Sequence, residues 1–466
     1  MRAQSDAEET TDGALAPARP SMFEALSIRD FRYLWVANLA ATFGMQMQMV
    51  ARGWLIYDMT SSPLALTWVM LSFMMPSFVF SLLGGVLADR VKKKQVMILA
   101  QMLNAAATLF LAIIVYTGHV TFWHFIYFGL FNGTVMAMSM PARTSLIPEI
   151  VGQKTLVNAM ALQSATFNLS RILGPALAGM LIAAFATLGT SHMQGTGVVF
   201  FIIAGLYVCA VIATWQLNYH GNPAERAEGA TMIGDVAEGF RYMKEEKVIL
   251  GLLILGFIPM TFGFTISFLL PAFNQDVIGG GPQDLGLLMT AMGAGALVGS
   301  LILARIGDVG KKGLILFVTA YIWAVLMVGF AFSDRLWLAM LLGGATSIFS
   351  GLYGALNMSI VQLTVKPEIR GRVMSINMMA MGMMPIGVIP ISAAAEFIGI
   401  QEALLISAAL LAISIFVLGM LFPDVRRIDK GYDEDDPPAM GPGGGSGGGP
   451  PMGAPPMAGP GGPARD

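Results

Sequence analysis

The chain repeats itself. When the sequence is compared with itself at an offset of 219 residues, short matches recur from the first apolar segment to the eleventh. The matched residues are turn formers, charges and glycines in an otherwise apolar sequence, so shared composition does not explain them. We therefore expect two tandem copies of one unit. The matches include Thr42 with Thr261, Gly44 with Gly263, Pro63 with Pro282, Asp89 with Asp308, Lys93 with Lys312, Glu149 with Glu368 and Asn158 with Asn377.

Composition places both copies in a membrane. Of the 466 residues, 55% are hydrophobic and 12% are charged, whereas an ordinary soluble domain carries about 25% charged residues. Several apolar runs reach the roughly 20 residues that a helix needs to cross a bilayer. The lone Cys209 excludes an internal disulfide. We expect an all-α membrane protein, and a duplicated membrane unit is typical of an alternating-access transporter.

Twelve helical spans are predicted, six in each copy, as two pseudo-symmetric six-helix bundles. They are expected at about 33–57, 63–88, 95–116, 122–140, 158–187, 197–217, 248–272, 284–304, 313–332, 336–359, 371–397 and 402–422. The regions are a cytoplasmic tail (1–28), a first bundle (29–217), a linker with a surface amphipathic helix (218–247), a second bundle (248–422) and a disordered Gly/Pro-rich tail (423–466).

Basic residues predict the orientation of the bundles. They fall in alternate connections, such as Lys92–Lys94 and Arg370–Arg372, while the opposite loops offer only Arg335. Because loops rich in Lys and Arg stay on the cytoplasmic side, both termini and the linker are predicted to be cytoplasmic, in a protein of the cell inner membrane. Residues 1–22 lack the positive start and short apolar stretch of a signal peptide.

A motif lies between the second and third predicted spans. The chain reads Gly85-Val86-Leu87-Ala88-Asp89-Arg90-Val91-Lys92-Lys93-Lys94. This resembles the signature loop of the major facilitator superfamily, G-x-L-A-D-R-x-G-R/K-R/K, with Lys92 where that family usually has Gly. The second copy carries Asp308 and Lys311 where the superfamily places its weaker second loop. The resemblance implies the major facilitator fold over about residues 23–422. It implies cytoplasmic gates at Gly85, Asp89, Arg90, Lys93, Asp308 and Lys311, where a carboxylate can face a helix N-terminus.

The fifth predicted span carries a second motif. Residues 170–179 are similar to the G-P-x-x-G-G element of exporting antiporters in that superfamily, with Ser170 at the leading Gly and Ala178 at the penultimate one. Gly174 and Gly179 would allow close helix approach and Pro175 would bend the helix, which suits a seal between cavity and periplasm. The alternative is an ordinary small-residue packing face with a kink.

Three further stretches, 54–66, 141–149 and 370–375, resemble the enterobactin-exporter and macrolide-efflux branch of the superfamily. This resemblance implies a proton-driven exporter of bulky, partly hydrophobic small molecules. It does not name the molecule.

Charges inside the predicted spans are candidates for the transport pathway. Arg52 and Arg171 lie well inside apolar stretches, where an arginine costs about 2.5–3.5 kcal/mol. One or both are expected to line the central pathway and to hold anionic or polar substrate groups or modulate a nearby carboxylate. The alternative for Arg52 is that it snorkels to the outer interface or pairs there with Asp58. Asp58, placed near Arg52, is the first candidate proton carrier and Glu396 the second, because burial and a nearby cation tune a carboxylate. For Asp276 an exposed loop position is favoured.

Neutral polar groups within the spans should orient substrate or bond neighbouring helices, and Gln46, Gln163, Asn168 and Asn357 are placed in the pathway. Methionine is abundant, with 35 residues. A copper pathway through the thioethers is one hypothesis, but flexible cavity filling is favoured because no Cys or His accompanies them. We therefore expect no metal site.

A secondary exporter is the leading prediction, with the proton gradient as energy source and no cofactor. The alternatives are an importer of a small metabolite and a non-transporting membrane scaffold. An enzyme is disfavoured, since no nucleophile with a base, metal cluster or phosphate loop is present. The expected partners are the lipid bilayer and a small-molecule substrate, without nucleic acid, and the expected state is a monomer.

Overall fold

The computed structural model describes residues 23–188, 191–219, 221, 246–306, 310–365, 369, 373–374, 376–377 and 384–428, with side chains except at 77–79, 81–90 and 384–386. Within these ranges every regular element is a helix. By length and composition, eight candidate membrane spans occur in this part of the chain. The helices are η1 (Glu24–Ser27), α1 (Arg29–Thr60), α2 (Pro63–Arg90), α3 (Lys93–Tyr116), α4 (Phe122–Thr187), α5 (His192–Trp215), α7 (Lys247–Gly263), α8 (Thr265–Asp276), α9 (Pro282–Ile306), α10 (Lys312–Ala331), α11 (Leu336–Thr364), α13 (Met384–Ile398), α14 (Ile400–Leu421) and α15 (Pro423–Arg426).

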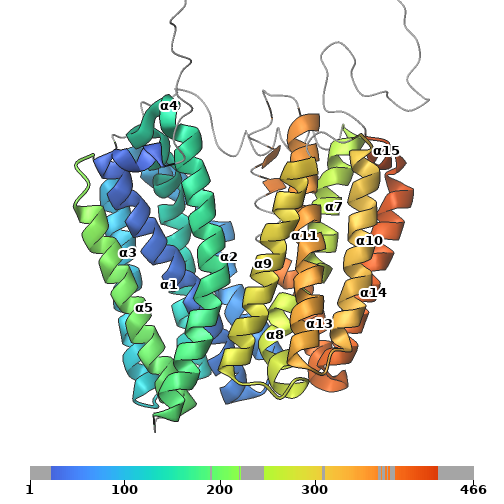
Figure 1. Ribbon diagram of the computed structural model, residues 1–466, viewed down its shortest axis with the longest axis horizontal. Coiled ribbons are helices and arrows are strands. Elements are labelled where there is room, and N and C mark those ends of the chain that lie inside the picture. The colour runs from blue at the N-terminus through green and yellow to red at the C-terminus, as the bar shows by residue number, and fades with distance from the viewer. Residues whose placement is uncertain are drawn as a thin grey trace, which may run out of the picture.

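The helices stand side by side in two groups, α1 to α5 and α7 to α15 (Figure 1). The main contacts between the groups are α4 with α9 and α2 with α13. We call the end of the molecule that carries the turns at 61–62, 117–121 and 332–335 the outer end, after the orientation that the basic residues predict. The opposite end, with the turn at 91–92 and the start of α10, is the inner end.

Helix α4 is the largest departure from the predicted spans. The sequence predicts that the fourth span ends near residue 140, yet α4 continues from Phe122 to Thr187, and its one non-helical residue is Gly152 at φ 65° and ψ 177°. Glycine adopts this positive φ without steric cost. Near Pro141, which lacks a backbone donor, the hydroxyls of Thr144 and Ser145 donate to nearby carbonyls. The predicted loop is therefore helix, and a single glycine turns the chain.

The seventh predicted span is divided into α7 and α8 at Phe264. Around this point, side-chain hydroxyls donate hydrogen bonds to backbone carbonyls. Thr265 donates to the carbonyl of Thr261 at 3.3 Å, and Ser407 donates to that of Phe262 at 2.7 Å. Such bonds compete with the helix ladder and bend helices. The predicted amphipathic helix of the linker and both predicted tails lie, for the most part, outside the described residues.

Glycines allow close backbone contacts between helices, and they do so in the same helix pair of each copy. A Cβ on Gly133 of α4 would lie 2.1 Å from the carbonyl oxygen of Phe73 of α2. A Cβ on Gly295 of α9 would lie 2.1 Å from that of Gly344 of α11. The offset of 219 residues carries α2 onto α9 and the first arm of α4 onto α11. The two copies therefore share a packing rule as well as sequence matches.

Candidate functional site

Hydrogen bonds between side chains join the two helix groups at the outer end. The Tyr57 hydroxyl of α1 donates to the Asp276 carboxylate of α8 at 2.5 Å. In the buried interior, the Thr67 hydroxyl of α2 donates to that of Ser392 of α13 at 2.6 Å. We call the outer seam the three pairs Tyr57–Asp276, Thr67–Ser392 and Ser62–Glu396, the last with an oxygen–oxygen distance of 3.0 Å.

The pair of Tyr57 and Asp276 is separated by 219 residues, which is the offset of the repeat. Equivalent positions in two copies related by a two-fold axis can touch only beside that axis. The contact therefore marks where the two copies meet face to face. The sequence analysis missed Tyr57 and favoured an exposed loop position for Asp276. The offset of 219 residues could have indicated the pair, because it makes Tyr57 and Asp276 equivalent positions of the two copies.

A cavity of about 360 Å³ opens beside this pair. Its walls include Tyr57 and the carboxylates of Asp276, Glu396 and Glu402, all three of which are exposed. The cavity belongs to the outer end of the seam and not to the interior of either helix group. Through this cavity, solvent at the outer end reaches the carboxylates that accept the seam hydrogen bonds.

The predicted helix-five element lies where α4 meets α9. A Cβ on Gly179 would lie 2.3 Å from the carbonyl oxygen of Pro282, and a Cβ on Gly286 would lie 2.6 Å from that of Pro175. Backbone therefore touches backbone across the two copies. Gly174 instead packs within the first copy, since its Cβ would lie 2.7 Å from the Cβ of Gln46.

Two polar contacts extend this junction toward the middle of the helices. The Thr290 hydroxyl of α9 donates to the carbonyl of Ile172 at 2.8 Å. Arg171, half-buried, donates from Nη2 to the carbonyl of Gly293 at 3.3 Å. The guanidinium that the sequence places in the pathway thus has a partner in the other copy.

Arg52 and Asp58 do not form the pair that the sequence suggests. The Arg52 side chain is buried, with its guanidinium carbon 5.2 Å from the centre of the Phe73 ring. Asp58 is exposed, and its electrostatic neighbour is His192 rather than Arg52. Six residues at 100° each turn the helix by about 240°, so the two side chains leave α1 on different sides. The expected pairing is therefore absent.

The neutral polar candidates are distributed through both copies. Gln46 is buried, and Gln163 accepts a weak hydrogen bond from Asn38 at 3.4 Å. Asn168 donates to a carbonyl of its own helix. Asn357 is buried and donates to the carbonyl of Leu252 at 3.1 Å. The hydrogen bond of Asn357 therefore links α11 to α7, whereas that of Asn168 stays within α4.

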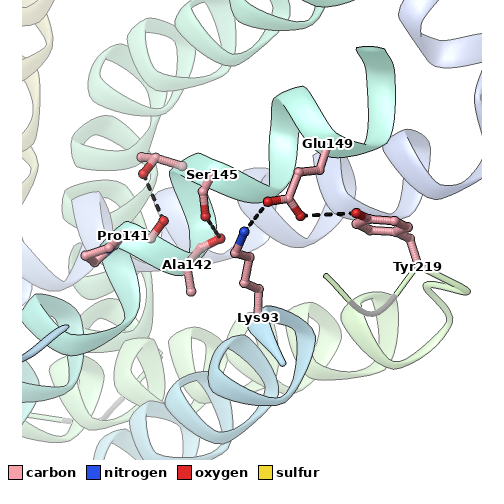
Figure 2. Close-up of polar contacts among 7 residues, drawn as sticks. Lys93, Pro141, Ala142, Ser145, Glu149 and Tyr219 are labelled. Atoms are coloured by element: carbon pink, nitrogen blue, oxygen red, sulfur yellow. Dashed lines mark hydrogen bonds and ion pairs between the residues drawn. The ribbon is translucent and has the colours of Figure 1, made fainter. Parts of the chain in front are cut away.

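At the inner end, polar contacts link parts of the first copy to one another (Figure 2). Lys93, at the start of α3, forms an ion pair with Glu149 of α4. The Tyr219 hydroxyl donates to the same carboxylate at 3.3 Å, and its backbone N–H donates to Asp30 at 2.7 Å. Burial and the Glu149 carboxylate raise the pKa of the Tyr219 phenol, so it stays a neutral donor. We call Asp30, Lys93, Glu149 and Tyr219 the inner cluster.

The remaining residues of the predicted gates are less fully placed. Gly85, Asp89 and Arg90 lie in the last turns of α2, where the backbone alone is described, and Asp308 lies outside the described residues. Lys311 is exposed and precedes α10 in the left-handed conformation, at φ 63°. Their part in gating stays a prediction.

Solved transporter structures share this fold. The nucleoside transporter NupG superposes with a TM-score of 0.64 at 17% identity, covering 84% of this chain and 99% of that one. A bacterial homologue of the human lysosomal transporter Spinster, in an inward-facing and unoccupied conformation, superposes with a TM-score of 0.65 at 15% identity, over 85% and 98% of the two chains. The chain therefore has the same fold as these two solved structures.

The sequence comparison is more specific. The chain belongs to the transmembrane secretion effector family of the major facilitator superfamily, whose model matches residues 20–435. Macrolide efflux protein A of Streptococcus pyogenes is 23% identical over 86% of this chain and 97% of its own length. The multidrug efflux pump Tap of Mycolicibacterium fortuitum is 24% identical over 84% and 95%. The staphyloferrin A transporter of Staphylococcus aureus is 22% identical over 85% and 96%.

Proposed function

We propose that this chain is a secondary active exporter of bulky, partly hydrophobic small molecules, driven by the proton gradient. Twelve spans in two six-helix bundles cross the inner membrane, with both termini in the cytoplasm. This count takes α4 as two spans that meet at Gly152, and α7 with α8 as one. The predicted eleventh span (371–397) includes most of α13, and its earlier part lies mostly outside the described residues.

The outer seam is the observation that carries this proposal. Two copies of one unit touch through a few hydrogen bonds and glycine contacts at the outer end. A junction of that kind can part and re-form as a unit, which alternating access by rocking of the two bundles requires. Export begins from a state that is closed outside, and a sealed outer seam is that closed state.

The substrate class comes from the relatives. Two of them are described as efflux proteins, for macrolides and for several drugs, and a third as a transporter of staphyloferrin A. These molecules share bulk and mixed polarity. An import role is the second candidate, because the same fold serves nucleoside transport in NupG.

Proton coupling is assigned to outer-end carboxylates. Asp58 and Glu396 remain the candidates, and Asp276 joins them because it accepts the Tyr57 hydroxyl in the outer seam. A proton that enters from outside and neutralises Asp276 or Glu396 weakens the hydrogen bond that the carboxylate accepts, since bonds to charged acceptors are about twice as strong as neutral ones. Proton entry and opening of the seam are thereby linked.

Purified protein in liposomes tests the proposal. Everted vesicles with an acidic interior are screened with fluorescent dyes, macrolides and siderophores, and the expected result is gradient-dependent accumulation inside. Accumulation in the opposite direction supports the importer, and gradient-independent behaviour of every compound rejects coupled transport. The variants Asp58→Asn, Asp276→Asn and Glu396→Gln then identify the carrier, since the correct one uncouples transport from the gradient.

A further inference from the structure

Arg52 is a buried arginine with no counter-charge among the described residues. Its side chain is 5% exposed, and neither Nε nor Nη1 has a hydrogen-bond partner. The described residues form no ion pair with it, and Asp58 on the same helix points elsewhere. A buried charge that lacks a partner is costly, and its replacement by an apolar residue is commonly neutral or stabilising. We therefore expect a ligand to supply the acceptors that the Nε and Nη1 groups of Arg52 lack.

Other buried or half-buried bases among the described residues do have partners. Arg171 donates to the carbonyl of Gly293, and Lys93 is paired with Glu149. Lys94 donates to the carbonyl of Leu217. Desolvation in this fold is therefore offset elsewhere by a partner from the chain. Arg52 differs from these three because no described residue accepts a hydrogen bond from its Nε or Nη1.

The surroundings of Arg52 are aromatic and positive. The face of the Phe73 ring lies beside the guanidinium, at 5.2 Å from ring centre to guanidinium carbon. Tyr207, which is 4% exposed, is its one titratable neighbour in the described part of the chain, and Tyr207 in turn neighbours Arg143. The phenol thus interacts electrostatically with two guanidinium groups, and no described carboxylate forms an ion pair with either of them. The second copy lacks this arrangement, because Arg52 is matched there by Pro271.

We propose that Arg52, with Arg143 and the Tyr207 hydroxyl, forms a subsite in the first copy for an anionic group of the transported molecule. The inference rests on the proposed export function and specifies its substrate class: a carboxylate, sulfonate or phenolate on an apolar body. The anion accepts the free N–H groups of Arg52, and Phe73 covers one face of the guanidinium. Charge-assisted bonds of this kind are the strong ones in a dry interior.

Three probes that share one fluorophore test this subsite. Dansylate is an anion, dansylamide is neutral and dansylcadaverine is a cation. Binding is measured by fluorescence on the full chain in zwitterionic nanodiscs, after subtraction of empty discs. Wild type is expected to bind dansylate at least roughly tenfold more tightly than dansylamide, the factor that one hydrogen bond to a charged group provides. Arg52→Met removes the preference, while the control Arg335→Gln, an exposed outer-loop arginine, retains it.

Thermal unfolding separates a binding role from a structural one. A guanidinium kept for a ligand destabilises the empty protein, so Arg52→Met raises the melting temperature without probe and abolishes the rise that dansylate gives to wild type. An Arg52→Met variant that is less stable when empty and still prefers dansylate overturns the subsite. Arg143→Gln gives a partial loss of the preference. Transport that persists without charge preference rejects the subsite alone, and anion binding without transport rejects the exporter alone.

Discussion

The outer and inner ends of the molecule use polar side chains in different ways. At the outer end, Tyr57–Asp276 and Thr67–Ser392 join one copy of the repeat to the other. At the inner end, the described bonds of Lys93, Glu149 and Tyr219 remain within the first copy. Polar groups at the outer end thus join the two copies, and those of the inner cluster join parts of one copy. The proposed rocking mechanism needs this division, because in it each bundle moves as a body when the seam parts.

The contrast also concerns access to water. The outer carboxylates Asp276 and Glu396 are exposed and line a cavity, whereas Lys93 of the inner cluster is buried. A proton can therefore reach the seam from the outer end without crossing the protein. Substitutions in the seam should therefore change the balance between closed and open states, and substitutions in the inner cluster should change stability alone.

The largest effect is expected from bulky side chains placed between α4 and α9, which we call wedges. Gly179→Val and Gly286→Val place a side chain against the carbonyls of Pro282 and Pro175, and backbone cannot swing aside as a side chain can. Overpacking of this kind costs about 1–3 kcal/mol, which shifts the closed-to-open ratio by roughly 5–150-fold. Spin labels at His119→Cys and Asp334→Cys, in a Cys209→Ser background, measure the separation of the outer ends.

Gly205→Val is the matched control for the wedges. It lies on α5, and no atom lies within 4 Å of the Cβ it would gain. Its distance distribution should match that of wild type. Wedged variants with unchanged distances and normal transport would mean that α4 and α9 are not part of the moving seam.

The buried pair of hydroxyls comes next. Thr67→Val leaves the Ser392 hydroxyl buried without its partner, which costs about 1.5 kcal/mol in the closed state. The double variant Thr67→Val with Ser392→Ala recovers much of that loss, because an apolar pair needs no hydrogen bond. The same spin-label distances give the free energies of a double-mutant cycle. Strictly additive effects would sink the assignment of this bond to the closed state.

Tyr57→Phe is expected to act in the same direction but more weakly. It removes the hydroxyl that Asp276 accepts, yet Asp276 is exposed and regains water when the bond is lost. The expected cost is about 0.5–1 kcal/mol in the closed state. Tyr321→Phe is the control, because Tyr321 is 38% exposed on α10. If Tyr57→Phe opened the outer end no more than this control, the contact on the repeat axis would be incidental.

The membrane class and the repeat were predictable from sequence because they depend on many residues at once. Apolar runs and a constant offset survive the loss of any single match. The helix boundary near Gly152 was not predictable from sequence. Two prolines and a run of polar residues are typical of a loop. Only the structure shows that the hydroxyls of Thr144 and Ser145 donate to carbonyls where the helix continues past Pro141.

The candidate site was predictable only in part. The small residues of the fifth span predicted a close helix contact, since the spacing of glycines can be seen in the local sequence. The partner of Tyr57 required knowing that equivalent positions face one another, and the partner of Arg171 is a backbone carbonyl that no side-chain pattern reveals. The failed pairing of Arg52 with Asp58 shows the limit of sequence distance, because helix rotation separated two residues that are near in the chain.

The smallest effect on the outer end is expected from the inner cluster, and this prediction examines the contrast most directly. Lys93→Met removes the ion pair with Glu149, whose exposure keeps the loss of stability within about 1 kcal/mol. The melting temperature should fall slightly, while the spin-label distances between outer ends stay those of wild type, because no described bond of Lys93 reaches the second copy. Exchange of the two charges in Lys93→Glu with Glu149→Lys should restore stability. A shift in those distances as large as that of Tyr57→Phe would instead show that Lys93 works as a gate, as the signature loop implies, and that the inner end shares in the balance between the two states.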